Sequence, residues 1–595
     1  MTLTSLSAVV RRLIVSPGPA REQRTRSVVS AAGVSAVLRA FGRSPEALPV
    51  RTVVYLGGPA TDPPPGPRHE GFTVRTVLTP GRALRLAHRE LHAGTADFAL
   101  VAGFGEPEQD TITVYAVKRA AEAVADSDPI LGVLDVTGTD EDAPPPLRPL
   151  RHGHRATDPD RHRLLLWSGR DTDDETRVRG ELLPLLDGLH SEAFPALPTA
   201  VPCGTRPGPV RAAAVSVSVL AVSSVHKARP VRADRPRPVA LLFPGQGSQH
   251  PGMAAGLYRR EPVFTAAVDA VLAHLGEDGR RIRDDWLNPG APRIPVDDVR
   301  RAQPLLFAVD YALGRLVLSW GVRPVALLGH SAGELVAATL AGVVSLPDAI
   351  AMVMSRVREA VKMPAGGMLA VAASEDQVRP YLDADVVVAA VNTAQQVMLA
   401  GAAAPLAAVE SRLRADGFTV VTVPATSPFH SPAMAPASDA VEADYRRIPL
   451  RDARLPLYSG YTGALLRPEE ALSPRFWARQ ITDTVHFRTA LEELLAIEDV
   501  LLVEAGPRQT LTAFARRHRA VRLGASAAVP LLPARRGTAE ADRQSVLTAA
   551  ARLWTEGHDL DVEALSRLWT WSDETPVAAT VPSGAHREPA PALRS

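Results

Sequence analysis

The feature that most constrains this chain is an apolar run that ends at a glycine turn and continues as a helical pattern. The run spans residues 325–328 (VALL), the turn is GHSAG at residues 329–333, and the helical stretch begins at Gly333. Residues 239–243 (VALLF), followed by Pro-Gly, show the same pattern earlier in the chain. Short apolar strands that lead into helices through glycine turns are typical of parallel βαβ units. The sequence therefore predicts an α/β fold with a parallel sheet.

The GHSAG turn also has the G-x-S-x-G pattern that holds a serine on a sharp bend. In this arrangement the Oγ of Ser331 projects clear of the backbone, and nearby amides face the place where an oxyanion forms. Glycines at positions 329 and 333 let the strand and the helix approach closely. The pattern is common by itself, so a chance turn of small residues is the competing interpretation. We predict that Ser331 is a nucleophile.

A serine hydroxyl needs a base to react at neutral pH, and the chain offers 16 histidines. His430 is the best placed by context, because it ends the apolar segment VTVPATSPFH and precedes Ser-Pro, which favours a loop. Arg356 follows the serine by 25 residues, in a predicted helix over Ala349–Val361. If buried, its guanidinium needs an anionic partner, for which a carboxylate is the natural choice. On pattern alone, His430 and Arg356 could equally be ordinary surface residues without a role in the site.

Composition sets the broad class of protein. Hydrophobic residues make up 46% and charged residues 22%, as in ordinary globular proteins. With 66 basic and 65 acidic residues the net charge is +1, which gives no reason to expect a nucleic-acid or membrane partner. The single cysteine, Cys203, cannot form an internal disulfide or a cysteine-based zinc site. We expect a soluble, cytoplasmic protein without a bound metal and with about two to four domains.

Composition changes along the chain predict its boundaries. Residues 228–238 (ARPVRADRPRP) alternate arginine and proline without an apolar period, which indicates a solvated linker. Residues 366–426 alternate short strands with two helices, which predicts a compact ferredoxin-like α+β insert. Residues 575–595 lack large apolar side chains and are expected to be disordered.

Seven motifs occur in a familiar order: FPGQGSQ, AQPLLFA, GHSAGE, PAGGMLAV, AVNTAQQVMLAG, PFHSPAM and LVEAGPRQTL. Together they resemble the malonyl-CoA:acyl carrier protein transacylase family, in the form of the acyltransferase domain of modular polyketide synthases. The resemblance covers residues 239–534, and residues 535–574 resemble the post-acyltransferase segment that packs back on such domains. It implies an α/β-hydrolase-like acyltransferase core that carries the ferredoxin-like insert.

The resemblance also implies a role for each site residue. Ser331 becomes acylated, His430 is its base, and a backbone carbonyl near His486, in TVHF, orients the imidazole. Arg356 pairs with the free carboxylate of a malonyl-type group. The remaining implied residues supply oxyanion amides or line the pocket: Gln246 and Ala332 for the amides, and Gln303, Phe429 and His330 for the pocket.

The implied reaction moves a malonyl-type unit from CoA to the phosphopantetheine thiol of an acyl carrier protein, in polyketide and antibiotic biosynthesis. It proceeds through an acyl-serine with ping-pong kinetics and needs no bound cofactor. Because we find no carrier-protein motif, we expect the carrier protein to act in trans. The tetrad SPFH at residues 427–430 stands where related domains carry HAFH for malonyl or YASH for methylmalonyl. Phe429 favours malonyl, whereas the small Ala332 leaves methylmalonyl or a rarer extender as the competitor.

Residues 1–227 more weakly resemble a shortened ketosynthase, a partial thiolase-like α/β region. Val77 stands at the position of the ketosynthase nucleophile, and Trp167 or Ser168 stands in place of its first catalytic histidine, while His226 falls on a matching histidine. Without the thiol no acyl thioester can form. The resemblance therefore predicts a non-catalytic region with a structural role or a docking role toward other polyketide synthase subunits.

Three alternatives to extender transfer stay open. The same serine and histidine could serve an acyl hydrolase that clears misloaded carrier proteins, or an enzyme that moves an unusual acyl group between carrier proteins. The third is an inactive scaffold that only binds a carrier protein. Arg356 separates these interpretations, because a hydrolase of simple acyl chains has no use for a guanidinium that faces an acyl carboxylate.

Overall fold

A computed structural model describes residues 162–187, 207–217 and 220–566, apart from residues 289, 291, 424, 426 and 498. Before residue 162 it gives the backbones of seven strands in one sheet, in the order β3-β2-β4-β5-β1-β6-β7. Their bounds are Val9–Val15 (β1), Thr52–Gly57 (β2), Phe72–Val77 (β3), Phe98–Phe104 (β4), Ile112–Lys118 (β5), Gly132–Leu134 (β6) and Leu147–Pro149 (β7). Strands β2, β3 and β4 are parallel, and the other pairs are antiparallel.

The ketosynthase-like interpretation remains a prediction for this N-terminal part. Val77 is the last residue of β3, but its side-chain surroundings lie outside the described residues. The same holds for Cys203 and for the tail at residues 575–595.

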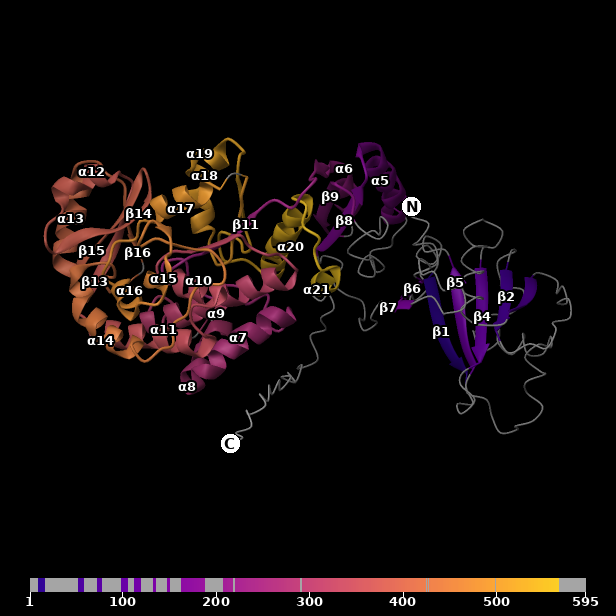
Figure 1. Ribbon diagram of the computed structural model, residues 1–595, viewed down its shortest axis with the longest axis horizontal. Coiled ribbons are helices and arrows are strands. Elements are labelled where there is room, and N and C mark those ends of the chain that lie inside the picture. The colour runs from indigo at the N-terminus through magenta and orange to yellow at the C-terminus, as the bar shows by residue number, and fades with distance from the viewer. Residues whose placement is uncertain are drawn as a thin grey trace, which may run out of the picture.

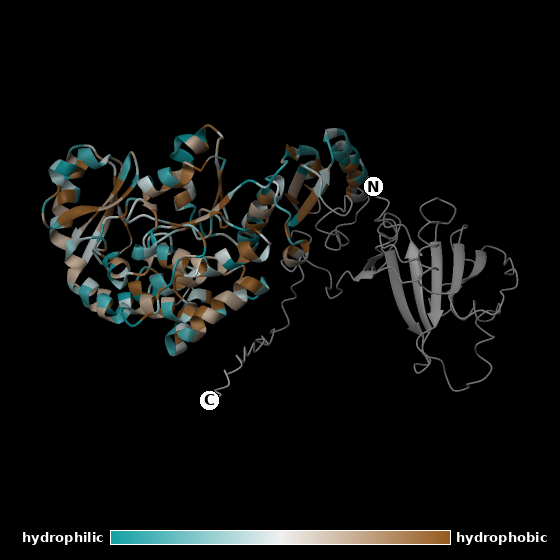
Figure 2. Cartoon of the chain, viewed as in Figure 1, coloured by the Kyte–Doolittle hydropathy of each residue, from teal (hydrophilic) through white to brown (hydrophobic). Residues whose placement is uncertain are grey.

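The central sheet has six strands in the order β18-β17-β12-β11-β19-β20. These are Val239–Phe243 (β11), Ala326–Gly329 (β12), Leu457–Ser459 (β17), Ala464–Leu465 (β18), Leu501–Glu504 (β19) and Ala527–Pro530 (β20). All neighbouring strands are parallel except the β17–β18 hairpin. Two strands with continuous apolar sequence, β11 and β12, lie at the centre, as expected for strands covered on both faces (Figure 2). The α/β prediction is confirmed.

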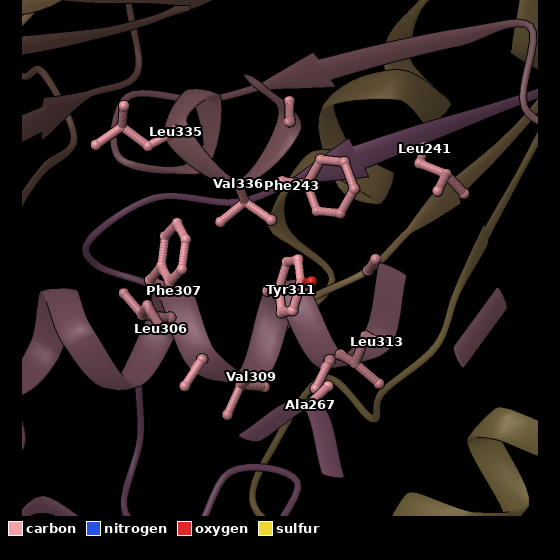
Figure 3. Close-up of a cluster of buried hydrophobic side chains, with 14 of the residues drawn as sticks. Leu241, Phe243, Ala267, Leu306, Phe307, Val309, Tyr311, Leu313, Leu335 and Val336 are labelled. Atoms are coloured by element: carbon pink, nitrogen blue, oxygen red, sulfur yellow. The ribbon is translucent and has the colours of Figure 1, made fainter. Parts of the chain in front are cut away.

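Alternate residues of β11 supply two separate cores. Leu241 and Phe243 pack on one face against α9 and α10, whereas Ala240 and Leu242 face α17 and α18 (Figure 3 shows the first face). The helices of the first face are Pro262–His274 (α7), Gly276–Leu287 (α8), Val299–Ser319 (α9), Gly333–Ala341 (α10), Leu346–Ala360 (α11), Ala435–Tyr445 (α14), Pro474–Arg479 (α16) and Ala539–Thr555 (α20). Those of the second face are Phe487–Leu495 (α17) and Thr510–Arg517 (α18).

Shorter helices connect these elements: Pro468–Ala471 (α15), Arg519–Arg522 (α19) and Val562–Ser566 (α21). Within the described part of the chain, no helix combines the length and apolar character needed to cross a bilayer.

The insert forms a separate four-stranded antiparallel sheet in the order β14-β15-β13-β16. Its elements are Gly366–Val371 (β13), Glu375–Val378 (α12), Val386–Thr393 (β14), Gln396–Ala402 (β15), Ala403–Ala415 (α13) and Val420–Val423 (β16). The helices α12 and α13 pack on one face of this sheet, and the other face meets α17 through Ala390 of β14 (Figure 1). The βαββαβ order and the strand order are those of a ferredoxin-like fold, as predicted.

A small α/β unit precedes the central sheet. It contains Arg163–Gly169 (β8), Thr172–Asp187 (α5), Val210–Ser216 (β9), Ala221–Lys227 (α6) and Val231–Arg232 (β10), with its strands antiparallel in the order β10-β9-β8. Trp167 is fully buried and donates to Glu175, and Ser168 accepts a hydrogen bond from the Gly208 amide. His226 is exposed on α6. Each of these three residues thus belongs to the surface or the packing of this unit.

Helix α20 joins the small unit to the central sheet. The indole Nε1 of Trp554 donates to the backbone carbonyls of Trp167 at 3.2 Å and Ala212 at 3.1 Å. The guanidinium of Arg211 lies 4.8 Å from the centre of the Trp554 ring and also pairs with Asp559. Because α20 contacts both parts, we infer that they fold as one cooperative body.

Replacing Trp554 with alanine is expected to lower the free energy of unfolding by about 3–5 kcal/mol, since it removes a buried indole from this junction. Urea denaturation followed by circular dichroism measures the change. Arg552→Ala on the same helix is the matched control, because that half-exposed arginine pairs with Glu556 at the helix C-cap, and its loss should cost about 0.5 kcal/mol or less. Equal effects of both substitutions would contradict the assigned role of α20.

Candidate active site

The nucleophile turn joins β12 to α10 at the carboxyl end of the central sheet. Ser331 has a φ of +54°, a left-handed conformation that is uncommon for a residue with a side chain. The turn is tight because a Cβ at Gly329 would lie 2.2 Å from the Glu334 amide, and one at Gly333 would lie 2.1 Å from the Phe243 carbonyl. The two glycines of G-x-S-x-G are therefore required by close backbone approach, as the sequence predicts.

Ser331 and His430 meet as predicted. The Oγ of Ser331 lies 2.7 Å from Nε2 of His430, although 99 residues separate them. His430 also has a positive φ, of +63°, and its amide donates to the Ile481 carbonyl. Its Nδ1 lies 3.1 Å from the backbone carbonyl of Asp483, an arrangement that places the proton on Nδ1 and leaves Nε2 free to accept the serine proton. A backbone carbonyl thus orients the imidazole of His430, and it belongs to Asp483, three residues before His486.

Two backbone amides lie close to Ser331 along the chain or in space, those of Ala332 and Gln246. Ala332 is the N-cap of α10, so its N–H lies at the positive end of the helix. Gln246 follows Gly245, where a Cβ would lie 3.2 Å from the Ser331 Cβ. Among the hydrogen bonds of the described residues, neither the Gln246 nor the Ala332 amide has a partner. Such unpaired donors suit an oxyanion that forms beside Ser331.

Arg356 is buried on α11, with 3% of its surface exposed. Its Nε donates to the Tyr445 hydroxyl, and its Nη2 donates to the Trp477 carbonyl and to Oε1 of Gln480. All three acceptors are neutral, and within the described residues no carboxylate forms an ion pair with Arg356. A buried guanidinium without an anionic partner is energetically unfavourable and favours the binding of an anion from outside.

Glu334, the last residue of GHSAGE, organises the loops around the site. Its carboxyl group accepts hydrogen bonds from the Ser459 hydroxyl, the Gly460 amide and Nε2 of Gln480. Burial raises the pKa of Glu334 to about 8, against the lowering effect of these bonds and of Arg356. Because Gln480 contacts both Glu334 and Arg356, one network fixes the β17–β18 hairpin and the guanidinium relative to each other.

The predicted pocket residues lie around this centre. Gln303 donates to Oε1 of Gln246 at 3.2 Å, and the Phe429 ring centre lies 6.5 Å from that of His430. His330 contacts Asn392 of β14 through Nε2 at 2.7 Å and so ties the nucleophile turn to the insert. Burial lowers the pKa of His330, which keeps its ring neutral.

A cavity of about 410 Å³ opens beside the base. It is lined by Val387 of the insert, by His430 and Pro432, by Tyr461 in the β17–β18 turn, and by the loop residues Thr482, Asp483, Thr484 and His486. The described residues contain no group of three or more His, Cys, Asp or Glu side chains placed to hold a metal ion.

Burial lowers the pKa of His430 to about 3, with smaller contributions from His330 and Arg356. A base must be neutral to accept a proton, and this imidazole takes up a proton only as the pH falls through its lowered pKa. We therefore predict that the rate of Ser331 acylation by an acyl thioester stays nearly constant between about pH 5 and pH 8. Rapid-quench kinetics over this range measure it, and a half-maximal rate near the ordinary histidine pKa of about 6.5 would contradict the buried state of the base.

Several contributors to the site were not predicted from the sequence. Asp483 acts through its backbone, and Gln480 and Tyr461 are polar residues in segments without a periodic pattern. Glu334 was visible within GHSAGE, and its position in the first turn of α10, three residues after the serine, was the signal that could have identified it.

Comparisons with known proteins agree with this geometry. The model of the acyl transferase domain family matches residues 240–557, more than half of the chain, and this range includes α20. A phenolphthiocerol/phthiocerol polyketide synthase protein from Mycobacterium tuberculosis is 38% identical over 331 residues, which are 54% of this chain and 22% of that protein. The spectinabilin polyketide synthase system protein NorB from Streptomyces orinoci is 34% identical over 54% of this chain and 15% of its own length. The chain therefore spans 15% to 22% of the length of these relatives.

Solved structures give the same assignment. The acyl transferase domain of SpnD, in complex with 2-(pent-4-yn-1-yl)malonyl, superposes with a TM-score of 0.59 at 29% identity, over 68% of this chain and 97% of that one. The acyltransferase domain from the second module of the salinomycin polyketide synthase has a TM-score of 0.52 at 31% identity, over 68% and 85% of the two chains. From the family match and these structural neighbours, this chain belongs to the acyl transferase domain family of polyketide synthases.

Proposed function

We propose that this protein loads a malonyl-type extender unit from CoA onto the phosphopantetheine thiol of an acyl carrier protein. The observation that carries the proposal is Arg356, a buried guanidinium whose three hydrogen bonds all go to neutral acceptors. The free carboxylate of a dicarboxylic acyl group supplies the missing charge, whereas an acetyl group does not.

In the first half-reaction, the Ser331 hydroxyl attacks the thioester carbonyl while Nε2 of His430 takes its proton. The resulting oxyanion is bound by the amides of Gln246 and Ala332. When the intermediate collapses, the C–S bond breaks and His430 returns the proton to the sulfur, which gives the acyl-serine and free CoA. The carbonyl of Asp483 holds the imidazole in the required tautomer throughout.

In the second half-reaction, the phosphopantetheine thiol enters the space that CoA has left and gives its proton to His430. Its sulfur attacks the acyl-serine, and the serine oxygen leaves with that proton. Because one thioester is exchanged for another, the free energy of the acyl group changes little over the reaction. The main requirement on the site is therefore to exclude water, which would hydrolyse the acyl-serine. The buried positions of His430, Arg356 and Phe429 suit this requirement.

Among dicarboxylic units, we propose that malonyl is preferred over methylmalonyl. Phe429 precedes the base, is 5% exposed and packs in the main core, so it has little freedom to move away from a branch at the α-carbon. A single methyl group changes selectivity by about 1–3 kcal/mol in an apolar pocket. The preference is therefore expected to be about tenfold or more rather than absolute.

A transfer assay tests the proposal. The protein is mixed with malonyl-CoA with and without a phosphopantetheinylated carrier protein, and malonyl-carrier and free malonate are quantified by mass spectrometry. Extender transfer predicts malonyl-carrier as the main product and slow malonate release without the carrier. Rapid malonate release that the carrier protein does not suppress would overturn the proposal in favour of hydrolysis.

A further inference from the structure

Tyr461 places an unpartnered phenol inside the candidate site. It lies in the turn of the β17–β18 hairpin and lines the cavity beside His430, whose ring centre is 6.1 Å away. The ring of Phe476 packs edge-on against it, with 6.5 Å between the ring centres. Its hydroxyl is buried and has no hydrogen-bond partner among the described residues. A buried hydroxyl without a partner is destabilising, so its presence beside a cavity indicates a partner that arrives with a ligand.

The Tyr461 hydroxyl shares the electrostatic environment of the whole site. The Ser331 side chain lies close enough to lower the pKa of the Tyr461 phenol, but the two groups do not meet the geometry of a hydrogen bond. The charge of Arg356 also lowers the pKa of this phenol, and the charge of Glu334 raises it. Burial raises the pKa of Tyr461, so the phenol stays protonated and can donate a hydrogen bond.

The hydrogen bonds of Arg356 indicate which acceptor the Tyr461 hydroxyl can serve. A guanidinium has five N–H groups, one on Nε and two on each terminal nitrogen. Tyr445 occupies Nε, and Trp477 and Gln480 together occupy Nη2, so the two N–H groups of Nη1 are left. A carboxylate usually binds an arginine through two nitrogens, one for each oxygen. With only Nη1 open, one carboxylate oxygen needs a donor from elsewhere.

The hairpin that carries Tyr461 is fixed to the same network. The Gly460 amide donates to Glu334, which accepts from Gln480, which in turn accepts from Arg356. On the other side, the Phe476 ring that contacts Tyr461 stacks edge-on against Trp477, whose carbonyl accepts from Arg356. The phenol and the guanidinium are thus held as parts of one structure.

We propose that the Tyr461 hydroxyl donates a hydrogen bond to the distal carboxylate of the bound acyl group, as the second donor beside Nη1 of Arg356. This proposal rests on the proposed function and assigns a specificity-determining residue within it. A dicarboxylic acyl group satisfies both the open nitrogen of Arg356 and the unpartnered phenol, whereas an acetyl group leaves both without a partner.

The test compares Tyr461→Phe with the wild-type protein, using malonyl-CoA and acetyl-CoA as donors for acylation of Ser331. Phenylalanine keeps the ring packing on His430 and Phe476 and removes only the hydroxyl. We expect kcat/KM for malonyl-CoA to fall about tenfold or more, and that for acetyl-CoA to change less than about twofold. The melting temperature should not fall, because the lost hydroxyl has no partner among the described residues.

Tyr458→Phe is the matched control on the same hairpin. Tyr458 packs with the core on the α17 side of the sheet, so its substitution should leave kcat/KM for both donors unchanged.

A double-mutant cycle with Arg356→Ala tests whether the two donors share one carboxylate. If they do, adding Tyr461→Phe to Arg356→Ala causes little further loss with malonyl-CoA. Equal losses on both donors, no loss on malonyl-CoA or strictly additive effects would each overturn the assignment. If wild-type protein forms no malonyl adduct at all, the proposed function fails instead, so the two failures are distinguishable.

Discussion

Replacing Arg356 with alanine should reduce kcat/KM for malonyl-CoA by roughly 10²- to 10³-fold, while the value for acetyl-CoA stays the same or rises. Removing one partner of a buried charge pair costs about 3–5 kcal/mol, because the other charge is left without compensation. Here the uncompensated charge is the acyl carboxylate in the acyl-enzyme. Initial rates of CoA release with each donor, under single-turnover conditions, measure the effect.

The ratio between the two donors separates specificity from damage to the fold. The substitution also strips Tyr445, Trp477 and Gln480 of a hydrogen bond, and any resulting loss of folded protein lowers both rates equally. Arg358→Ala is the matched control, because that arginine lies on the same helix, is 56% exposed and pairs with Asp444 at the surface. An unchanged ratio of malonyl to acetyl transfer in Arg356→Ala would refute the carboxylate-binding role.

Replacing His430 with alanine should slow acylation of Ser331 by about 10²- to 10⁴-fold with either donor, since the serine loses its base. The oxyanion amides of Gln246 and Ala332 remain and should preserve some activity above the uncatalysed reaction. Single-turnover acylation followed by rapid quench and mass spectrometry gives the rate constants.

His486→Ala provides the contrast. His486 lies three residues after the orienting carbonyl and lines the same cavity, but its side chain is exposed and contributes no atom to the Ser331–His430–Asp483 arrangement. Its replacement should change acylation less than about threefold. A loss as large as that of His430→Ala would mean that the loop orients the base in a different way from the one described.

The parts of this protein that follow from local pattern could be predicted from the sequence. The strand, turn and helix around Ser331 are encoded by adjacent residues, and the alternation of strands and helices at residues 366–426 identified the ferredoxin-like insert. Ordered motifs then paired Ser331 with His430, which neither spacing nor composition could do alone, and they are the source of the role proposed for Arg356.

The remaining features depend on contacts that leave no local signature. The backbone carbonyl of Asp483 orients the base, and because every residue has a carbonyl, no residue type marks the position. Gln480 reaches Glu334 across 146 positions of the chain, and Tyr461 becomes significant only because its hydroxyl lacks a partner among the described residues. Likewise, the family resemblance places Trp167 and Ser168 at a ketosynthase site. In the structure, the carbonyl of Trp167 in β8 instead accepts a hydrogen bond from Trp554 of α20, 387 residues later.

The most direct test of the account is the intact mass of the protein after mixing with equal concentrations of malonyl-CoA and acetyl-CoA, without a carrier protein. We predict a single malonyl adduct on the wild-type protein, little acetyl adduct, and no adduct on Ser331→Ala. A malonyl adduct that persists in Ser331→Ala, or a wild-type protein that takes acetyl in preference to malonyl, would contradict the claim that this site is a serine acyltransferase selective for a carboxylate.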